Sequence, residues 1–294
     1  MLVTWALNGL GCTGPLTEIP VSTLEGVDVT ASSFHRIYDD VRLRDRFFKF
    51  LQNIFHLYPE DKFHQLVIDL TKVYGTDEEI YRNVLERLPS ITPLGGLVTY
   101  ALPALNAQKR VMTAQGLHFL SDLTQIHGYI EVGTTGRYLK PLAKQIPIVG
   151  PRILVNDISP TYGPADMVER GRVLKNGSFV ALSDYSPFDP TAIPKSSAQV
   201  VSNLIGFHHC PEGKLEGFIQ SLRLSMKQNG RLLLREHNVV DDTMNTFVSL
   251  AHDVFNAGVA ITWEDNTQQV RHFRSVADWT AKLEASGFRR RGSP

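Results

Sequence analysis

Three acidic residues end or nearly end successive β-rich runs in the second half of the chain. Glu131 lies in "YIEV", two residues before Gly133. Asp157 ends "RILVND" and Asp184 ends "SFVALSD". A carboxylate ahead of a glycine turn can receive a cationic amino group but would repel a pyrophosphate, whereas one at the next strand end can accept hydrogen bonds from both hydroxyls of a ribose. The pattern predicts a site for a nucleoside that also carries an amino group.

The loop that follows Glu131 reads "GTTGRY". Gly133 and Gly136 allow the backbone to turn tightly and to approach a ligand, which a Cβ atom would obstruct. Thr134 and Thr135 are small and offer hydroxyl groups. The lysine of a phosphate-binding P-loop is absent, so the loop does not indicate nucleoside triphosphate hydrolysis. Asp184 and the following Tyr185 suit the exocyclic amine and the flat face of an adenine.

These features resemble the class I methyltransferases that use S-adenosylmethionine, over residues 128–288. The Glu131 turn matches their first motif, although Thr135 and Arg137 stand where that motif has glycines, and "VVSNLIGFHH" sits where their fourth motif ends a strand. The resemblance implies S-adenosylmethionine as cofactor. The residues expected to bind it are Glu131, Gly133, Thr134, Thr135, Gly136, Tyr138, Asp157, Ile158, Asp184, Tyr185, Ser202 and Asn203.

A base is needed in methyl transfer only if the nucleophile keeps its proton at neutral pH. The candidates follow the fourth and fifth strand-like runs: His208, His237 and Glu236. Tyr38, in "SSFHRIYDD", is a further candidate, with Phe34 and His35 as pocket residues. We expect no metal, because the adjacent residues of "HHC" cannot all face one ion comfortably.

The pattern of apolar and polar residues along the chain predicts the helices and strands that position these residues. Beyond residue 127, apolar runs at 129–132, 152–157, 178–184, 199–205 and 231–236 alternate with helical patterns. Strands that are apolar without alternation are typical of a parallel sheet covered by helices on both faces. We therefore predict an α/β, doubly wound, mostly parallel Rossmann-like sheet. A segment around 259–263 is a candidate for completing its edge.

The first part of the chain predicts helices instead. They run from 33 to about 58, from a Thr76–Glu79 capping box to Pro89, and from 106 to 126, with no strand before 128. The predicted domains are an all-helical N-terminal cap at 1–126, serving as a substrate lid, and a cofactor-binding domain at 127–294.

Composition limits the partners. Of 294 residues, 43% are hydrophobic and 20% charged, and the formal net charge is zero. A neutral chain has no long-range attraction to nucleic acid or anionic lipid, so we expect neither as partner. Two cysteines and no apparent signal or membrane segment favour a cytoplasmic location. A homodimer is left open.

The predicted function is S-adenosylmethionine-dependent N- or O-methylation of a small molecule in specialised metabolism. One alternative is a cyclase or lyase, in which the cofactor's own amine attacks and methylthioadenosine is released. A non-catalytic binding protein is a third reading. A dinucleotide-dependent oxidoreductase is disfavoured, because Glu131 stands ahead of the glycines.

Overall fold

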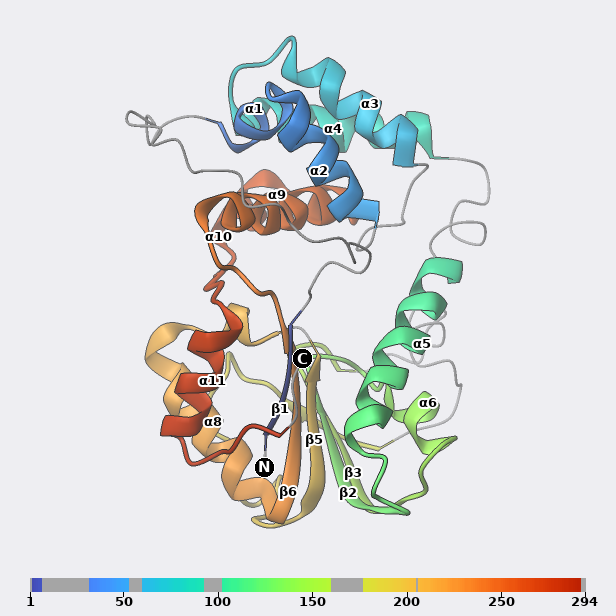
Figure 1. The fold of residues 1–294 in the computed structure, drawn as a ribbon, viewed down its shortest axis with the longest axis vertical. Helices are drawn as coiled ribbons and strands as arrows, with labels where there is room; N and C mark the ends of the chain where they lie inside the picture. Colours follow the sequence, from blue (N-terminus) through green and yellow to red (C-terminus); the bar gives the residue numbers. More distant parts are fainter. Residues whose placement is uncertain are drawn as a thin grey trace. The chain divides into compact units, whose positions relative to one another are not determined.

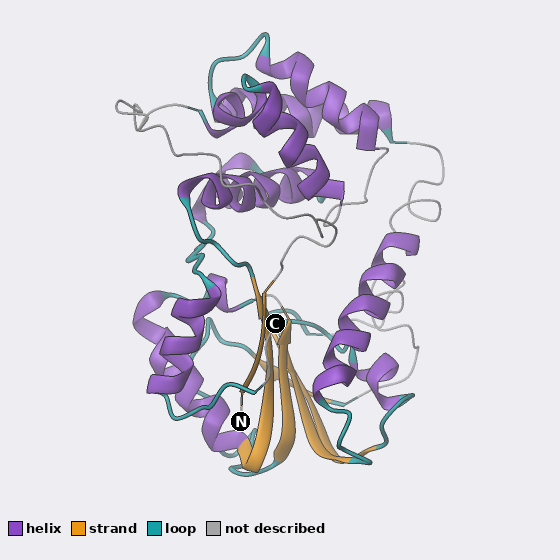
Figure 2. Ribbon diagram, viewed as in Figure 1, coloured by secondary structure: helices purple, strands orange, loops and turns teal. Residues whose placement is uncertain are grey.

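The computed structural model describes residues 2–6, 32–52, 60–92, 102–159, 177–204 and 206–291. The chain forms two compact units, whose elements are shown in Figure 1 and Figure 2. The first, the sheet unit, comprises Met1–Leu7, Leu105–Val240 and Val270–Pro294, and the second, the helical unit, comprises Asn8–Ala104 and Asp241–Gln269. The division corrects the boundary expected at residue 126, because each unit takes segments from both halves of the chain.

Within the described residues, the sheet unit contains one 6-stranded sheet in which every pairing is parallel. Its strands are β1 (Leu2–Ala6), β2 (Ile126–Val132), β3 (Ile148–Asn156), β4 (Ser178–Ala181), β5 (Ala198–Leu204) and β6 (Met226–Glu236). Their order is β1-β6-β5-β2-β3-β4. From β2 the chain adds strands first on one side and then on the other, so strand order reverses between β2 and β5. This confirms the doubly wound, Rossmann-like sheet and locates its ligand-binding edge.

Two expectations about the sheet edge are wrong. The N-terminal strand β1 lies beside β6, in register from Leu2 with Leu232 to Ala6 with Glu236. The expectation of no strand before 128 failed because β1 is a short run whose partner lies far along the chain. The segment 259–263 is not a strand, because Val259 caps α9 (Asp242–Gly258) and Thr262 caps α10 (Trp263–Gln268).

Helices cover both faces of the sheet (Figure 1). On the α8 face, α8 (Glu212–Ser225) and α11 (Val276–Ala285) pack on strand residues that include Ile130, Val201 and Leu234. On the α5 face, α5 (Leu102–Phe119) and α6 (Leu139–Ala143) cover Tyr129, Val200 and Leu233. Alternation along each strand therefore assigns Glu131, Ser202 and Arg235 to the α5 face, and Asn203 and Glu236 to the α8 face.

The helical unit contains α1 (Ser33–Tyr38), α2 (Val41–Gln52), α3 (Glu60–Thr71) and α4 (Asp77–Ile91) together with α9 and α10. The single helix expected from 33 is two helices, because Asp40 Oδ1 accepts hydrogen bonds from the amides of Arg42 (2.7 Å) and Leu43 (3.1 Å) and starts α2. The predicted end near 58 lies outside the described residues. None of the described helices is long and apolar enough to cross a membrane.

Two other helix limits differ from expectation. The Thr76–Glu79 capping box is confirmed, but α4 continues past Pro89 to Ile91, because a proline in the last turn interrupts few further backbone bonds. Helix α5 ends at Phe119 rather than 126, and Ile126 already belongs to β2.

A substitution at Gly128, within β2, tests the backbone conformation of the strand that leads to the candidate site. The φ of Gly128 is +84°, and a Cβ atom there would lie 2.0 Å from the carbonyl oxygen of Ser197. We expect Gly128→Ala to lower the free energy of unfolding by at least about 2 kcal/mol, measured by urea denaturation. Gly213→Ala is the matched control, because a Cβ atom there meets nothing within 4 Å. Equal stabilities of the two variants would contradict the described backbone path.

Candidate functional site

The loop after β2 has the backbone conformation that its glycines suggest. Gly133 has φ +86° and Gly136 has φ +100°, a region that side chains with a Cβ atom rarely adopt. The Gly133 amide donates a 2.8 Å hydrogen bond to the carbonyl oxygen of Val155, which anchors the start of the loop to β3. The two positions therefore require glycine for the turn itself.

Glu131 braces this loop from inside. Its carboxylate is 1% exposed, and Oε1 accepts hydrogen bonds from the Tyr138 amide (3.1 Å) and the Thr134 hydroxyl. Oε2 accepts from the Tyr129 hydroxyl at 3.1 Å. Burial raises the pKa of Glu131, although these donors oppose the shift. Both oxygens are thus engaged within the protein, and the expected contact with a ligand amine stays a prediction.

The two threonines of the loop differ. Thr134 Oγ1 accepts hydrogen bonds from the amides of Gly136 (3.2 Å) and Arg137 (3.1 Å), so it shapes the turn. Thr135 is also buried, but its hydroxyl has no hydrogen-bond partner among the described residues. A buried polar atom without a partner is costly unless a ligand or water satisfies it.

The end of β5 presents a second unsatisfied group. Ser202 Oγ is 2.7 Å from the Tyr129 hydroxyl and so joins the network around Glu131. Asn203 is completely buried, yet neither its Oδ1 nor its Nδ2 has a partner in the described part of the chain. Since β2 and β5 flank the point where strand order reverses, this amide lies where the topology predicts a ligand.

Asp157 follows β3 at the same edge of the sheet and is exposed. Partial burial, together with the negative charge of Asp184, raises its pKa. Ile158 is 70% exposed beside Asp157 and offers an apolar surface. The structure therefore leaves Asp157 and Ile158 accessible, as a nucleoside contact requires.

The residues after β4 adopt an unusual turn. Ser183, Asp184 and Tyr185 have φ values of +51°, +50° and +56°, and three consecutive left-handed residues store backbone strain. The Asp184 carboxylate pairs with Lys214 Nζ. Tyr185 is 8% exposed, its hydroxyl donates to the Gly206 carbonyl oxygen at 2.6 Å, and its ring packs edge-on against Phe218. The ring expected to face an adenine instead lies in the core of the α8 face, because the turn directs it inward.

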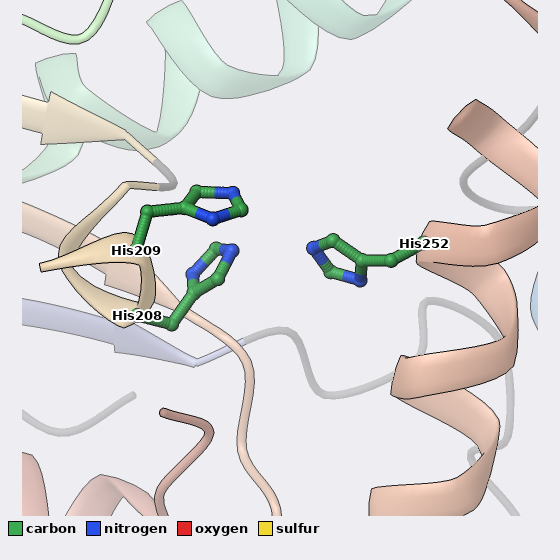
Figure 3. Close-up of side chains that lie close together, drawn as sticks. All are labelled: His208, His209 and His252. Atoms are coloured by element: carbon green, nitrogen blue, oxygen red, sulfur yellow. The ribbon is translucent and has the colours of Figure 1, made fainter. Parts of the chain in front are cut away.

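Beyond β5, a short 3₁₀ helix η2 (Phe207–His209) carries His208, one of the two histidines predicted as bases. His208 Nδ1 donates a 2.6 Å hydrogen bond to Glu236 Oε2, and both side chains are buried. Glu236 Oε1 accepts from the amides of Gly206 (2.8 Å) and Phe207 (2.5 Å). Figure 3 shows His208 and His209 side by side on η2, with ring centroids 4.1 Å apart.

The electrostatics of this dyad follow from burial and pairing. Burial alone would raise the pKa of Glu236, but the hydrogen bond from His208, and the charge of that ring when it is protonated, lower the pKa to about 2. The ring of His237 is 5.2 Å from that of His208, and burial together with His208 lowers the pKa of His237 to about 3. Glu236 therefore stays ionised and orients His208, as a carboxylate does for a catalytic imidazole.

His208, Glu236 and His237 lie close together in the sheet unit, whereas Tyr38 belongs to the helical unit. Tyr38 is 5% exposed in the core of the helical unit, and its ring contacts Phe47 edge-on with centroids 6.1 Å apart. Phe34 belongs to the same core, and His35 bonds Asp39 and the carbonyl oxygen of Tyr74. These aromatic residues pack the helical unit, because helical spacing directs them inward, and the catalytic assignment of Tyr38 has no support in these contacts.

Arg235 follows the fifth predicted strand beside the candidates Glu236 and His237, and the sequence assigned it no catalytic or cofactor-binding role. It precedes Glu236 on β6 and is 6% exposed on the α5 face. The alternation of β6 was the available signal, because it turns Arg235 and Glu236 to opposite faces near one sheet edge.

Comparison with known proteins gives likenesses of fold. No family model matches the chain, and no curated protein matches it. Solved structures that match include the YcgJ protein from Bacillus subtilis, at 18% identity over 59% of this chain and 66% of that chain with a TM-score of 0.42. A putative methyltransferase from Bacillus halodurans matches at 18% identity over 60% of this chain and 68% of that one, with a TM-score of 0.43.

The CurJ carbon methyltransferase matches over more of this chain, 84%, and 73% of its own, at 12% identity and a TM-score of 0.47. Two of these three proteins are named as methyltransferases. At such low identities and TM-scores, the function proposed below rests on this chain's own residues.

The buried histidines predict a pH-dependent stability. A histidine whose pKa is lowered on folding binds a proton more readily when unfolded, so stability falls as pH drops below about 6.5. For His237, with a folded pKa of about 3, the loss begins near the unfolded value. The His237→Gln variant lacks this titrating group. Between pH 7 and pH 5 we therefore expect its free energy of unfolding to fall by roughly 1–2 kcal/mol less than that of wild type.

The measurement is urea denaturation at pH 7, 6 and 5, a range above the titration of Glu236 at about 2. His127→Gln is the control, because His127 is exposed and its variant should keep the wild-type pH dependence. Parallel curves for wild type and His237→Gln would show that His237 titrates alike in the folded and unfolded chain.

Proposed function

We propose that the chain is an S-adenosylmethionine-dependent methyltransferase that acts on a small molecule. The observation that carries the proposal is one arrangement: a glycine turn braced by Glu131 and a buried His208–Glu236 dyad follow neighbouring strands at one edge of a doubly wound sheet. The turn has the form that seats a nucleoside cofactor, and the dyad has the form of a general base.

The residues at this edge fit the cofactor. The left-handed glycines 133 and 136 let the backbone approach a ligand, and Asp157 offers an accessible carboxylate to ribose hydroxyls. The amide of Asn203 and the hydroxyl of Thr135 are buried without partners among the described residues, so a polar ligand can satisfy them. Ile158 would cover part of the base. Glu131 acts on the cofactor through the shape of the loop.

S-adenosylmethionine, when bound, supplies an electrophilic methyl group. His208 then holds the acceptor's N–H or O–H group and takes its proton at Nε2, because Nδ1 is engaged by Glu236. The ionised Glu236 stabilises the imidazolium that results and fixes the ring orientation. Glu236 is a positioning residue, since its own oxygens accept from Gly206, Phe207 and His208.

The acceptor class follows from charge and architecture. The chain's formal net charge of zero favours a small molecule over a polyanion. We propose N- or O-methylation in biosynthesis, in the cytoplasm, with the helical unit contributing to acceptor selection. The domain role that the sequence predicted, a lid, is retained here for Asn8–Ala104 and Asp241–Gln269.

The ribose assignment predicts the effect of Asp157→Ala on cofactor affinity. We expect the variant to bind S-adenosylhomocysteine at least tenfold more weakly, about 1.4 kcal/mol, because one charged hydrogen-bond acceptor is lost. Calorimetry measures the affinity. Asp189→Ala is the control, because Asp189 lies on the loop after β4 and its carboxylate accepts a hydrogen bond within that loop, from the Thr191 amide (2.8 Å). Wild-type affinity in Asp157→Ala would remove the ribose role.

The base assignment predicts a loss of turnover with binding retained. Wild type is incubated with S-adenosylmethionine, with and without a metabolite extract, and the products are identified by mass spectrometry. We expect adenosylhomocysteine only with extract, and at least about 100-fold less of it from His208→Gln at unchanged cofactor affinity. Methylthioadenosine without extract would instead indicate the cyclase or lyase reaction. Undiminished turnover in His208→Gln would rule out this base.

A further inference from the structure

Arg235 is a buried cation that forms no direct ion pair within the described part of the chain. The side chain is 6% exposed, and no described residue hydrogen-bonds or ion-pairs with its guanidinium. Burial lowers the pKa of Arg235, and the nearby Tyr138 and Glu236 only oppose this shift. Because burying an unpaired charge is costly, a fold keeps such a group where something else compensates it.

The two neighbours do not supply that compensation. The Tyr138 hydroxyl lies 2.7 Å from Met112 Sδ, and burial raises the pKa of Tyr138, so it remains neutral. Glu236 extends to the opposite face of β6, where His208 and two backbone amides occupy its oxygens. Among the described residues, no carboxylate therefore pairs with Arg235 on the α5 face.

Helix α5 encloses this position. The carbonyl oxygen of Phe119 accepts from Arg231 (2.7 Å), and Gly116 lies beside Leu233, so α5 runs antiparallel to β6. Met112 lies one helical turn before Gly116, and Arg235 lies two residues after Leu233. These two steps have about the same length, so Met112 is level with Arg235. Lys109, 7% exposed, follows on the same side of α5 toward the edge of the sheet where β6 ends.

Arg231 provides an internal comparison on the same strand and face. Its guanidinium forms a two-point ion pair with Asp122, with Nη1–Oδ1 and Nη2–Oδ2 distances of 2.5 Å each. This arginine, 6% exposed, is fully compensated by the protein, whereas Arg235, equally buried, is not. Among the described residues, Arg231 therefore contributes a stabilising ion pair to the fold, whereas Arg235 contributes none.

We propose that Arg235 binds a carboxylate of the ligand at the carboxyl end of β6. A guanidinium matches a carboxylate through two parallel hydrogen bonds, and the buried setting strengthens the pair. The inference rests on the proposed function, which gives the carboxylate two sources: the amino-acid end of the cofactor, or an acceptor that carries a carboxylate. Either source would place an anion against the guanidinium of Arg235.

The first arm of the test measures binding by calorimetry for wild type, Arg235→Met and Arg231→Met. The ligands are S-adenosylhomocysteine, which has the carboxylate, and methylthioadenosine, which lacks it. If the cofactor supplies the anion, Arg235→Met loses at least tenfold in affinity for the first ligand and nothing for the second. Arg231→Met keeps wild-type affinity for both.

The second arm addresses an acceptor carboxylate. Wild type saturated with S-adenosylhomocysteine is heated with and without benzoate or acetate. If the acceptor supplies the anion, these probes raise the melting temperature of wild type but not of Arg235→Met, while both proteins bind S-adenosylhomocysteine equally. No effect of Arg235→Met in either arm overturns the proposal.

Melting of the ligand-free proteins separates ligand binding from a structural role. Arg235→Met should melt at or above the wild-type temperature, because it removes an uncompensated charge, whereas Arg231→Met should melt lower. A large drop for Arg235→Met would also contradict the proposal. If wild type binds neither nucleoside, the proposed function fails. If wild type binds them and Arg235→Met binds equally well in both arms, only the inference about Arg235 fails.

Discussion

The candidate site depends on one buried carboxylate, that of Glu131, which must find donors inside the protein. A carboxylate shielded from water is stable only with several hydrogen bonds, and here the amide of Tyr138 and the hydroxyls of Thr134 and Tyr129 supply them. These hydrogen bonds hold the chain around the carboxylate after β2, with Gly133 exposed, Gly136 buried and both in left-handed conformations. The loop shape that a nucleoside requires is thus set by the electrostatics of a residue that the ligand need not touch.

A second buried carboxylate organises the other half of the site. Glu236 ends β6 and ties the start of η2 to the sheet through Gly206 and Phe207, which holds His208 in one orientation. The preceding residue, Arg235, turns to the opposite face of the same strand. Adjacent residues of one strand therefore act on opposite faces: Glu236 orients the imidazole of His208 on the α8 face, and Arg235 places a guanidinium on the α5 face.

The sequence predicted those parts whose signals are local. Apolar runs located β2 to β6, and the capping box at Thr76 located α4. Strand β1 was missed because its pairing with β6 joins distant segments, and the inward position of Tyr185 depends on the left-handed turn at residues 183–185, which no spacing reveals. The acids at strand ends were found by residue type, whereas the isolation of Arg235 becomes visible only when its neighbours, and the partner of Arg231, are known.

The most direct test of the central claim is a crystal structure of the protein with S-adenosylhomocysteine. The account predicts the nucleoside at the carboxyl ends of β2 and β3, its ribose hydroxyls within hydrogen-bond distance of Asp157, and its chain lying over Gly133 to Gly136 toward β5. Density for the ligand on another surface, with Asp157 and this loop exposed to solvent, would contradict it.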